Sequence, residues 1–238
     1  MPNLDYFVLG KGPAILFLHG WGQNKEMMLP LVNRLKKCYT CIAIDMPGFG
    51  NSEYNQEMTM QEYCKTIHDF LLLKLHTTPL YIIGHSFGGK VAMEYYLRYG
   101  NIKGIVLIAS PVLKPKRKLS FYWNLFVYKV KKGLKIKNNM GSEDYKNAKE
   151  LKSLLVNVVN THYNKRVNKI KTPLLLIYSK EDEKVDFIRA KQLNRKVKKS
   201  TLKVIKGDHF AYLNNENKVA MEINNFIKEK GVKREYYL

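Results

Sequence analysis

Short apolar runs alternate along the chain with longer segments in which apolar residues recur at helical spacing. The short runs are rich in β-branched and aromatic residues, which indicates strands. Several are apolar at every position, as expected of parallel strands that helices cover on both faces. They occupy residues 6–9, 14–18, 39–44, 80–83, 105–108, 174–178 and 202–205.

The longer segments between these runs predict helices. Thr59, three residues before Glu62, has the spacing of a capping box, and Gly100 is a natural end for the helix before it. The predicted helices span residues 24–36, 59–75, 87–99, 186–197 and 217–228. This order predicts one α/β domain, with a mostly parallel sheet and helices on both faces.

One segment interrupts the alternation. Residues 112–171 contain no strand pattern and favour helices over 119–132 and 142–160. We expect this segment to be a helical lid inserted between two late strands, with residues 1–111 and 172–238 forming the core. It holds 16 basic and 3 acidic residues, a large part of the net charge of +21.

The high charge reflects lysine more than arginine. Lys makes up 34 of the 41 basic residues, whereas Arg, which suits phosphate recognition, is scarce. We therefore expect no specific nucleic-acid partner. Residues 119–136 are amphipathic and rich in lysine, so weak contact with an anionic membrane is kept as an alternative. The sequence does not predict an oligomeric state.

The cysteines indicate a reducing environment. Cys38, Cys41 and Cys64 cannot all pair, and no second Cys or His pair completes a metal site around the first two. No secretory or membrane-spanning pattern opens the sequence. A cytoplasmic protein is expected.

A nucleophile motif follows the fourth apolar run. Gly84-His85-Ser86-Phe87-Gly88-Gly89 stands between a predicted strand and a predicted helix, the setting of a strained turn that exposes a nucleophilic serine. We expect Ser86 to be the nucleophile. The amide of Phe87, at the start of the helix, is expected to bind an oxyanion.

Three further motifs each follow an apolar run. They are His19-Gly20-Trp21-Gly22, the acidic loop Glu181-Asp182-Glu183, and Gly207-Asp208-His209-Phe210. A carboxylate in the second could hold the tautomer of a histidine in the third. Glu181, Glu183 and Asp186 are rivals to Asp182 for that role.

Together these motifs resemble the α/β-hydrolase family, and so does Asp45-Met46-Pro47-Gly48-Phe49-Gly50-Asn51-Ser52, which looks like a structural turn of that family. The His19–Gly22 segment is similar to that of pimeloyl-ester esterases. The family order of serine, acid and histidine implies a triad of Ser86, Asp182 and His209, with His19 structural. The resemblance also implies the Trp21 amide as the second oxyanion donor.

The implied chemistry is hydrolysis of a carboxylic ester or thioester, with a small to medium apolar ester favoured, through an acyl-enzyme and without metal or cofactor. Trp21 and an aromatic cluster in the expected lid, Phe121, Tyr122, Trp123 and Phe126, are predicted to bind the substrate. Two alternatives remain at this point. One is a ligand receptor on the same fold that does not hydrolyse, and the other is a lipase-like enzyme that docks on anionic membranes through the basic lid.

Overall fold

The computed structural model describes residues 3–54, 57–115 and 149–231. Seven strands form one sheet in the order β1-β3-β2-β4-β5-β6-β7. All neighbouring strands are parallel except β1, which pairs antiparallel with β3. The strands are β1 Tyr6–Leu9, β2 Ala14–Leu18, β3 Thr40–Ile44, β4 Tyr81–His85, β5 Gly104–Ile108, β6 Leu174–Ser179 and β7 Ser200–Ile205.

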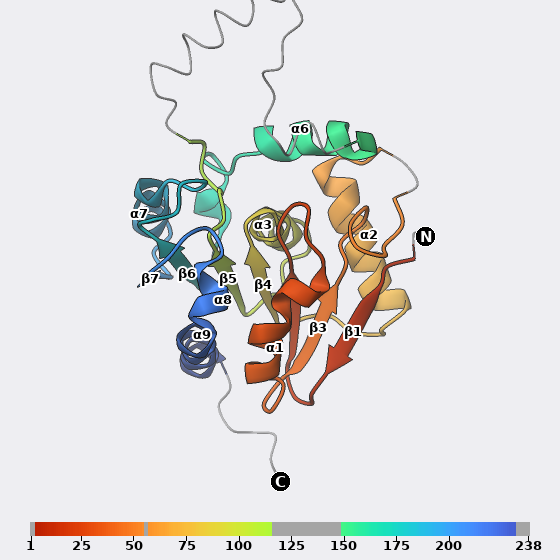
Figure 1. The fold of residues 1–238 in the computed structure, drawn as a ribbon, viewed down its shortest axis with the longest axis horizontal. Helices are drawn as coiled ribbons and strands as arrows, with labels where there is room; N and C mark the ends of the chain where they lie inside the picture. The colour runs from red at the N-terminus through yellow and green to blue at the C-terminus, as the bar shows by residue number, and fades with distance from the viewer. Residues whose placement is uncertain (1–2, 55–56, 116–148, 232–238) are drawn as a thin grey trace, which may run out of the picture.

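Helices cover both faces of this sheet (Figure 1). Short 3-10 turns, η1 Lys25–Met28, η2 Lys149–Leu151 and η3 Val167–Lys169, accompany them. The α-helices are α1 Leu29–Leu35, α2 Met60–Leu73, α3 Phe87–Tyr99, α6 Lys152–Asn160, α7 Phe187–Lys196, α8 Ala211–Asn214 and α9 Glu216–Gly231. The predicted α/β class, with a mostly parallel sheet between helices, is confirmed.

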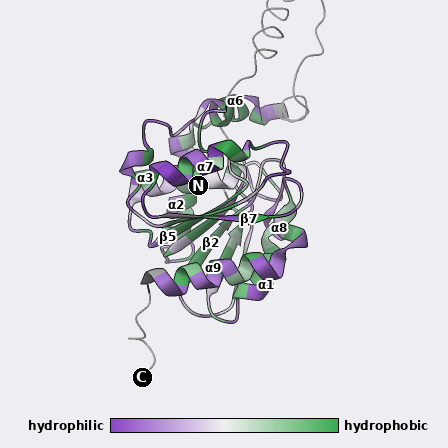
Figure 2. Ribbon diagram, turned by 90° about the vertical axis from the view of Figure 1, so that its left-hand side faces the viewer, coloured by the Kyte–Doolittle hydropathy of each residue, from purple (hydrophilic) through white to green (hydrophobic). Residues whose placement is uncertain are grey.

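Alternate residues of each central strand enter two separate cores. Leu16 and Leu18 of β2 pack into the layer of α2, α3 and α7, whereas Ile15 and Phe17 pack into the layer of α1 and α9. The strands are therefore apolar on both faces, and Figure 2 shows hydrophobic strands between two layers of helices whose outer sides are hydrophilic.

The observed bounds differ from the predicted ones by short distances that have local causes. The predicted helix at 24–36 starts as the 3-10 turn η1, and α1 begins only at Leu29, with a proline at its start. Proline suits the first turn of a helix because it lacks an N–H to donate. Strand β7 begins two residues early, since Ser200 and Thr201 continue the pairing with β6.

The inserted segment is described at residues 112–115 and from residue 149 onward. There η2 and α6 replace the end of the helix predicted over 142–160, and α6 packs against α2. The helix predicted over 119–132 lies outside the described residues, as do Phe121, Tyr122, Trp123 and Phe126. No helix in the described part of the chain is long and apolar enough to cross a membrane.

Candidate active site

Ser86 occupies the turn between β4 and α3. Its φ is 49° and its ψ is −111°, a backbone conformation that is costly for a residue with a side chain. The Ser86 amide donates to the carbonyl of Ile108 on β5 at 2.8 Å, which fixes the turn to the neighbouring strand. The sheet thus holds Ser86 in a strained conformation at the end of its central strand.

Two glycines of the motif make this turn possible. A Cβ on Gly84 would lie 2.4 Å from the carbonyl oxygen of Gly88, and a Cβ on Gly88 would lie 2.3 Å from that of Leu18. Neither approach is tolerated by a real side chain, so the close packing of α3 against β2 and β4 requires glycine at both positions.

His209 and Asp182 reach Ser86 from the loops that follow β7 and β6. His209 Nε2 lies 3.0 Å from Ser86 Oγ, and His209 Nδ1 lies 2.8 Å from Asp182 Oδ2. Gly207, with a φ of 119°, allows the turn that carries His209. These are the three residues that the motifs predicted would meet, and they form one continuous series of hydrogen bonds.

The rival carboxylates have other partners. Glu181 accepts a hydrogen bond from the Gly207 amide at 2.9 Å, and Asp186 caps α7 by accepting from the Ile188 amide. Glu183 is exposed. Of the four acidic residues in this loop and at its end, Asp182 is the one hydrogen-bonded to His209.

Asp182 is set up to remain ionised. Burial acts to raise its pKa, but the hydrogen bond from His209, the attraction to that imidazole and the backbone hydrogen bonds together outweigh burial, and the pKa lies below its ordinary value. Its second oxygen accepts from the amides of Lys184 at 2.8 Å and Val185 at 3.0 Å. These contacts orient the carboxylate toward His209 Nδ1, which leaves Nε2 to face the serine.

Two other histidines near the site are buried and bound to backbone groups. His19 Nδ1 lies 2.7 Å from the carbonyl of Gly20, and its Nε2 accepts from the Met46 amide at 3.0 Å. His85 Nε2 lies 3.1 Å from the carbonyl of His209. Burial lowers the pKa of His19 to about 4 and that of His85 to about 3. Both are therefore neutral at neutral pH.

These lowered pKa values predict acid sensitivity. The unfolded chain gains a proton at each histidine as the pH falls below 6.5, while the folded protein does not. The free energy of unfolding should therefore fall between pH 6.5 and about 4.5, by up to about 1.4 kcal/mol per pH unit for each histidine. Urea unfolding at several pH values measures this slope. We expect His19→Asn to flatten it and the exposed His76→Asn to leave it unchanged, and equal slopes in all three proteins would contradict the assignment.

The two residues predicted to donate to an oxyanion lie beside Ser86. Trp21 and Phe87 both line a cavity together with Ser86 and His209. The Trp21 ring packs edge-on against Phe87, with ring centroids 5.5 Å apart. The Gly20 amide donates to Gln23 Oε1 at 2.9 Å, which fixes the loop before Trp21. Oxyanion binding by the two amides remains a prediction.

The cavity above Ser86 has a volume of about 270 Å³. Part of its wall comes from the inserted segment, through Leu155, Val158 and Val159 of α6. The sequence did not single out these residues, nor Lys90, Pro111, Lys184, Val185 and Phe210, which also line it. Cavity residues of this kind have no motif, because they are selected by shape rather than by a fixed chemical step.

Helix α3 also holds the described part of the inserted segment. Lys90 Nζ donates to the carbonyl of Val158 at 2.6 Å, and the Tyr163 hydroxyl donates to the carbonyl of Lys90 at 2.9 Å. One turn further on, Arg166 binds Glu94 through two hydrogen bonds of 2.7 and 3.1 Å. The helix that begins next to Ser86 therefore binds the described part of the inserted segment along its side.

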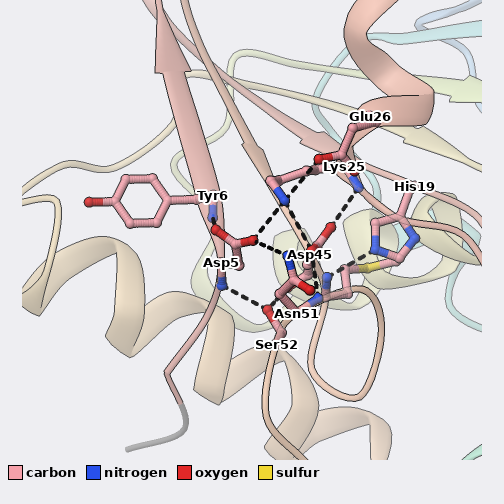
Figure 3. A network of polar contacts seen from close by, with 9 residues as sticks. Asp5, Tyr6, His19, Lys25, Glu26, Asp45, Asn51 and Ser52 are labelled. Atoms are coloured by element: carbon pink, nitrogen blue, oxygen red, sulfur yellow. Dashed lines mark hydrogen bonds and ion pairs between the residues drawn. The ribbon is translucent and has the colours of Figure 1, made fainter.

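A buried ionic network supports the loops on the other side of the site (Figure 3). Lys25 Nζ lies 2.8 Å from Asp5 Oδ2 and 3.1 Å from Asp45 Oδ2, and its side chain is 8% exposed. The Asp45 carboxylate also accepts from the amides of Lys25 and Asn51. Burial opposes the charge on Lys25, but these carboxylates raise the pKa of Lys25 above its ordinary value. The predicted turn over residues 45–52 thus forms part of a structural network in which Lys25 was not foreseen.

Removing the lysine should be costly. We expect Lys25→Met to lower the free energy of unfolding by about 3–5 kcal/mol, because the Asp45 side chain, 1% exposed, would be left charged without its cation. Urea unfolding of Lys25→Met measures the loss. The exposed Lys37→Met removes the same charge and should change stability by less than about 0.5 kcal/mol. Similar values for both variants would show that the network contributes nothing.

Within residues 3–54, 57–115 and 149–231, no three His, Cys, Asp or Glu side chains are placed to hold a metal ion. The three cysteines are free thiols, with Cys38 exposed and Cys41 and Cys64 buried.

Curated relatives match part of the chain. A monoacylglycerol lipase, ABHD6 of Bos taurus, is 36% identical over 93 residues, which are 38% of this chain and 28% of the relative. A pimeloyl-acyl-carrier-protein methyl ester esterase from Shewanella sp. (strain MR-7) is 34% identical over 112 residues, 46% of this chain and 39% of the relative. The chain therefore matches well under half of the length of these relatives.

Solved structures and a family model cover more of the chain. A bromoperoxidase from Bacillus anthracis superposes with a TM-score of 0.77 at 21% identity, covering 95% of this chain and 96% of the other. An esterase from Exiguobacterium antarcticum gives a TM-score of 0.75 at 20% identity, with 95% and 96% covered. At identities of 20% and 21%, these similarities show that this chain shares the fold of both structures. The model of the alpha/beta hydrolase fold matches residues 13–132, half of the sequence. The chain belongs to the alpha/beta hydrolase fold family.

Proposed function

We propose that this protein is a serine hydrolase that cleaves a carboxylic ester, or a thioester, through an acyl-enzyme. The observation that carries the proposal is the series Asp182, His209 and Ser86, joined by hydrogen bonds of 2.8 and 3.0 Å at the wall of a cavity. A nucleophile, a base and a group that orients the base are the components that acyl transfer requires.

The proposed reaction has two steps. His209 Nε2 takes the proton from Ser86 Oγ as this oxygen bonds to the carbonyl carbon, and the same proton then passes to the departing alkoxide or thiolate. Water next attacks the acyl-serine and gives its proton to His209, which returns it to Ser86 Oγ as the acid leaves. Ionised Asp182 stabilises the charged imidazole in both steps.

Charge on the substrate oxygen needs donors in place before the reaction. We assign this role to the backbone amides of Phe87 and Trp21, since Phe87 is the first residue of α3 and Trp21 lies across the same cavity. The start of a helix carries partial positive charge, which favours a developing oxyanion. The strained backbone of Ser86 supports this assignment, because such strain is typical of functional turns.

Ester substrates are the first class to test. The relatives are named as a monoacylglycerol lipase and a methyl ester esterase, but the partial matches do not carry over either substrate. The cavity of about 270 Å³ lies at the small end of ligand pockets, which favours a small acyl group. We also assign residues 112–171 as a lid over the core 1–111 and 172–238, because α6 supplies part of the cavity wall.

The test is hydrolysis of p-nitrophenyl and methyl esters of increasing acyl length, combined with a fluorophosphonate probe and mass spectrometry. We expect turnover of short esters and a single adduct on Ser86. A labelled Ser86 with one burst and no further turnover on any ester would favour a ligand receptor. If Ser86 stayed unlabelled and no ester were cleaved, the proposed function would be wrong.

A further inference from the structure

Lys90 is a buried cation in the wall of the candidate substrate cavity. It lies one turn along α3 from Ser86, its residue is 3% exposed, and it lines the same cavity as Ser86 and His209. Its ammonium group donates to the carbonyl of Val158 at 2.6 Å. An ammonium group carries three N–H donors, so this one contact leaves donor capacity on a side chain that lines the cavity.

No anion in the described part of the chain neutralises Lys90. None of the described carboxylates forms an ion pair with its Nζ, and Glu94, the next acidic residue along α3, is bound to Arg166. Burial lowers the pKa of Lys90 to about 8, so the side chain is still mostly charged at neutral pH. A buried charge without a counter-ion is costly, and a substrate that supplied one would bind more tightly for that reason.

The position of Lys90 indicates which half of an ester would meet it. The leaving group must lie near His209, which protonates it, and His209 stands with Lys184 and Phe210 on loops after β6 and β7. Lys90 and Val158 belong instead to α3 and α6, and α6 packs on α2. Helix α2 lies beside β1, at the opposite edge of the sheet from β6 and β7 (Figure 1). The acyl half is therefore the part that extends toward Lys90.

We infer that Lys90 binds a carboxylate at the far end of the acyl chain, so that the preferred substrates are half-esters of short dicarboxylic acids. The inference rests on the proposed function and names its substrate class. A carboxylate is compact enough for a cavity of about 270 Å³ and accepts hydrogen bonds from an ammonium group in the required geometry. Loss of its charge-assisted contact should reduce the preference about 10- to 100-fold.

The kinetic test compares two esters within each protein. Monomethyl glutarate is paired with methyl pentanoate, and monomethyl adipate with methyl hexanoate, and methanol release gives kcat/KM for each. We expect the parent to prefer the half-ester and Lys90→Met, of similar length, to lose about 10- to 100-fold in this ratio. Lys103→Met, an exposed lysine at the opposite end of the sheet, removes the same charge and should keep the parent's ratio.

A binding test does not depend on turnover. Calorimetric titration of monomethyl glutarate into Ser86→Ala should show binding that weakens about 10-fold or more when Lys90→Met is added. An unchanged ester ratio in Lys90→Met, or equal binding with and without Lys90, would overturn the inference. The proposed function would still stand in that case if the protein hydrolysed neutral esters. Absence of all hydrolysis together with an unlabelled Ser86 would instead remove the proposed function, and the titration would still decide whether Lys90 binds carboxylates.

Discussion

Replacing Ser86 with Ala is expected to lower kcat by about 10⁴-fold or more on any ester that the protein hydrolyses. The change removes the only atom that the proposed mechanism bonds to the acyl group, while His209 and Asp182 keep their mutual hydrogen bond of 2.8 Å. Stability should not fall, since alanine still has to adopt the same backbone conformation with a smaller side chain. Initial rates and urea unfolding measure the two effects separately.

A double variant makes this prediction more specific. His209→Ala alone should cost about as much as Ser86→Ala, and the two changes together should cost hardly more than either one, because residues that act as a unit are not additive. Losses that multiplied would indicate that Ser86 and His209 act independently. A Ser86→Ala protein that retained a tenth of the parent's activity would contradict the nucleophile assignment.

Asp182→Asn is expected to lower kcat by about 10²- to 10⁴-fold with little change in KM. An amide at this position can donate to His209 Nδ1, which would place the imidazole proton on Nε2 and turn it toward Ser86. The histidine could then no longer accept the serine proton. Steady-state kinetics at a pH where the parent is fully active measure the loss.

Two neighbouring carboxylates provide matched controls. Asp186→Asn should be nearly neutral, because asparagine also caps a helix and Asp186 caps α7. Glu183→Gln, at an exposed position, should likewise keep its activity. A larger loss in either control than in Asp182→Asn would assign the orienting carboxylate to a different residue of this loop.

Most of the site residues that could be predicted came from the sequence motifs. Ser86, Asp182 and His209 each follow a strand of the sheet, and the carboxyl ends of parallel strands meet at one edge, so their proximity follows from strand order. The family order of residues did not separate Asp182 from its rivals such as Glu181, because both lie between Ser86 and His209 in the sequence. Only the structure shows that Glu181 is bound to the Gly207 amide instead.

Other parts of the site could not be predicted, for physical reasons. Lys90 lies in a helix whose sequence does not distinguish a buried lysine from an exposed one, and its burial depends on α6, some 60 residues further along the chain. Lys25 likewise meets Asp5 and Asp45 only after three separate segments have folded together. The four-residue helix α8 was missed because so short an element has no periodicity to detect.

Helix α3 both begins beside Ser86 and binds the inserted segment, and this limits how the protein could be re-engineered. A chimaera that exchanged the inserted segment for that of another family member would have to bring partners for Lys90 and Glu94, whose contacts with Val158 and Arg166 cross the graft boundary. Without them, a buried lysine and a buried glutamate would face a foreign surface on the helix that begins beside Ser86. The exchangeable unit is therefore the inserted segment together with one face of α3. A chimaera that replaced only the residues between the end of β5 and the start of β6 should fold poorly.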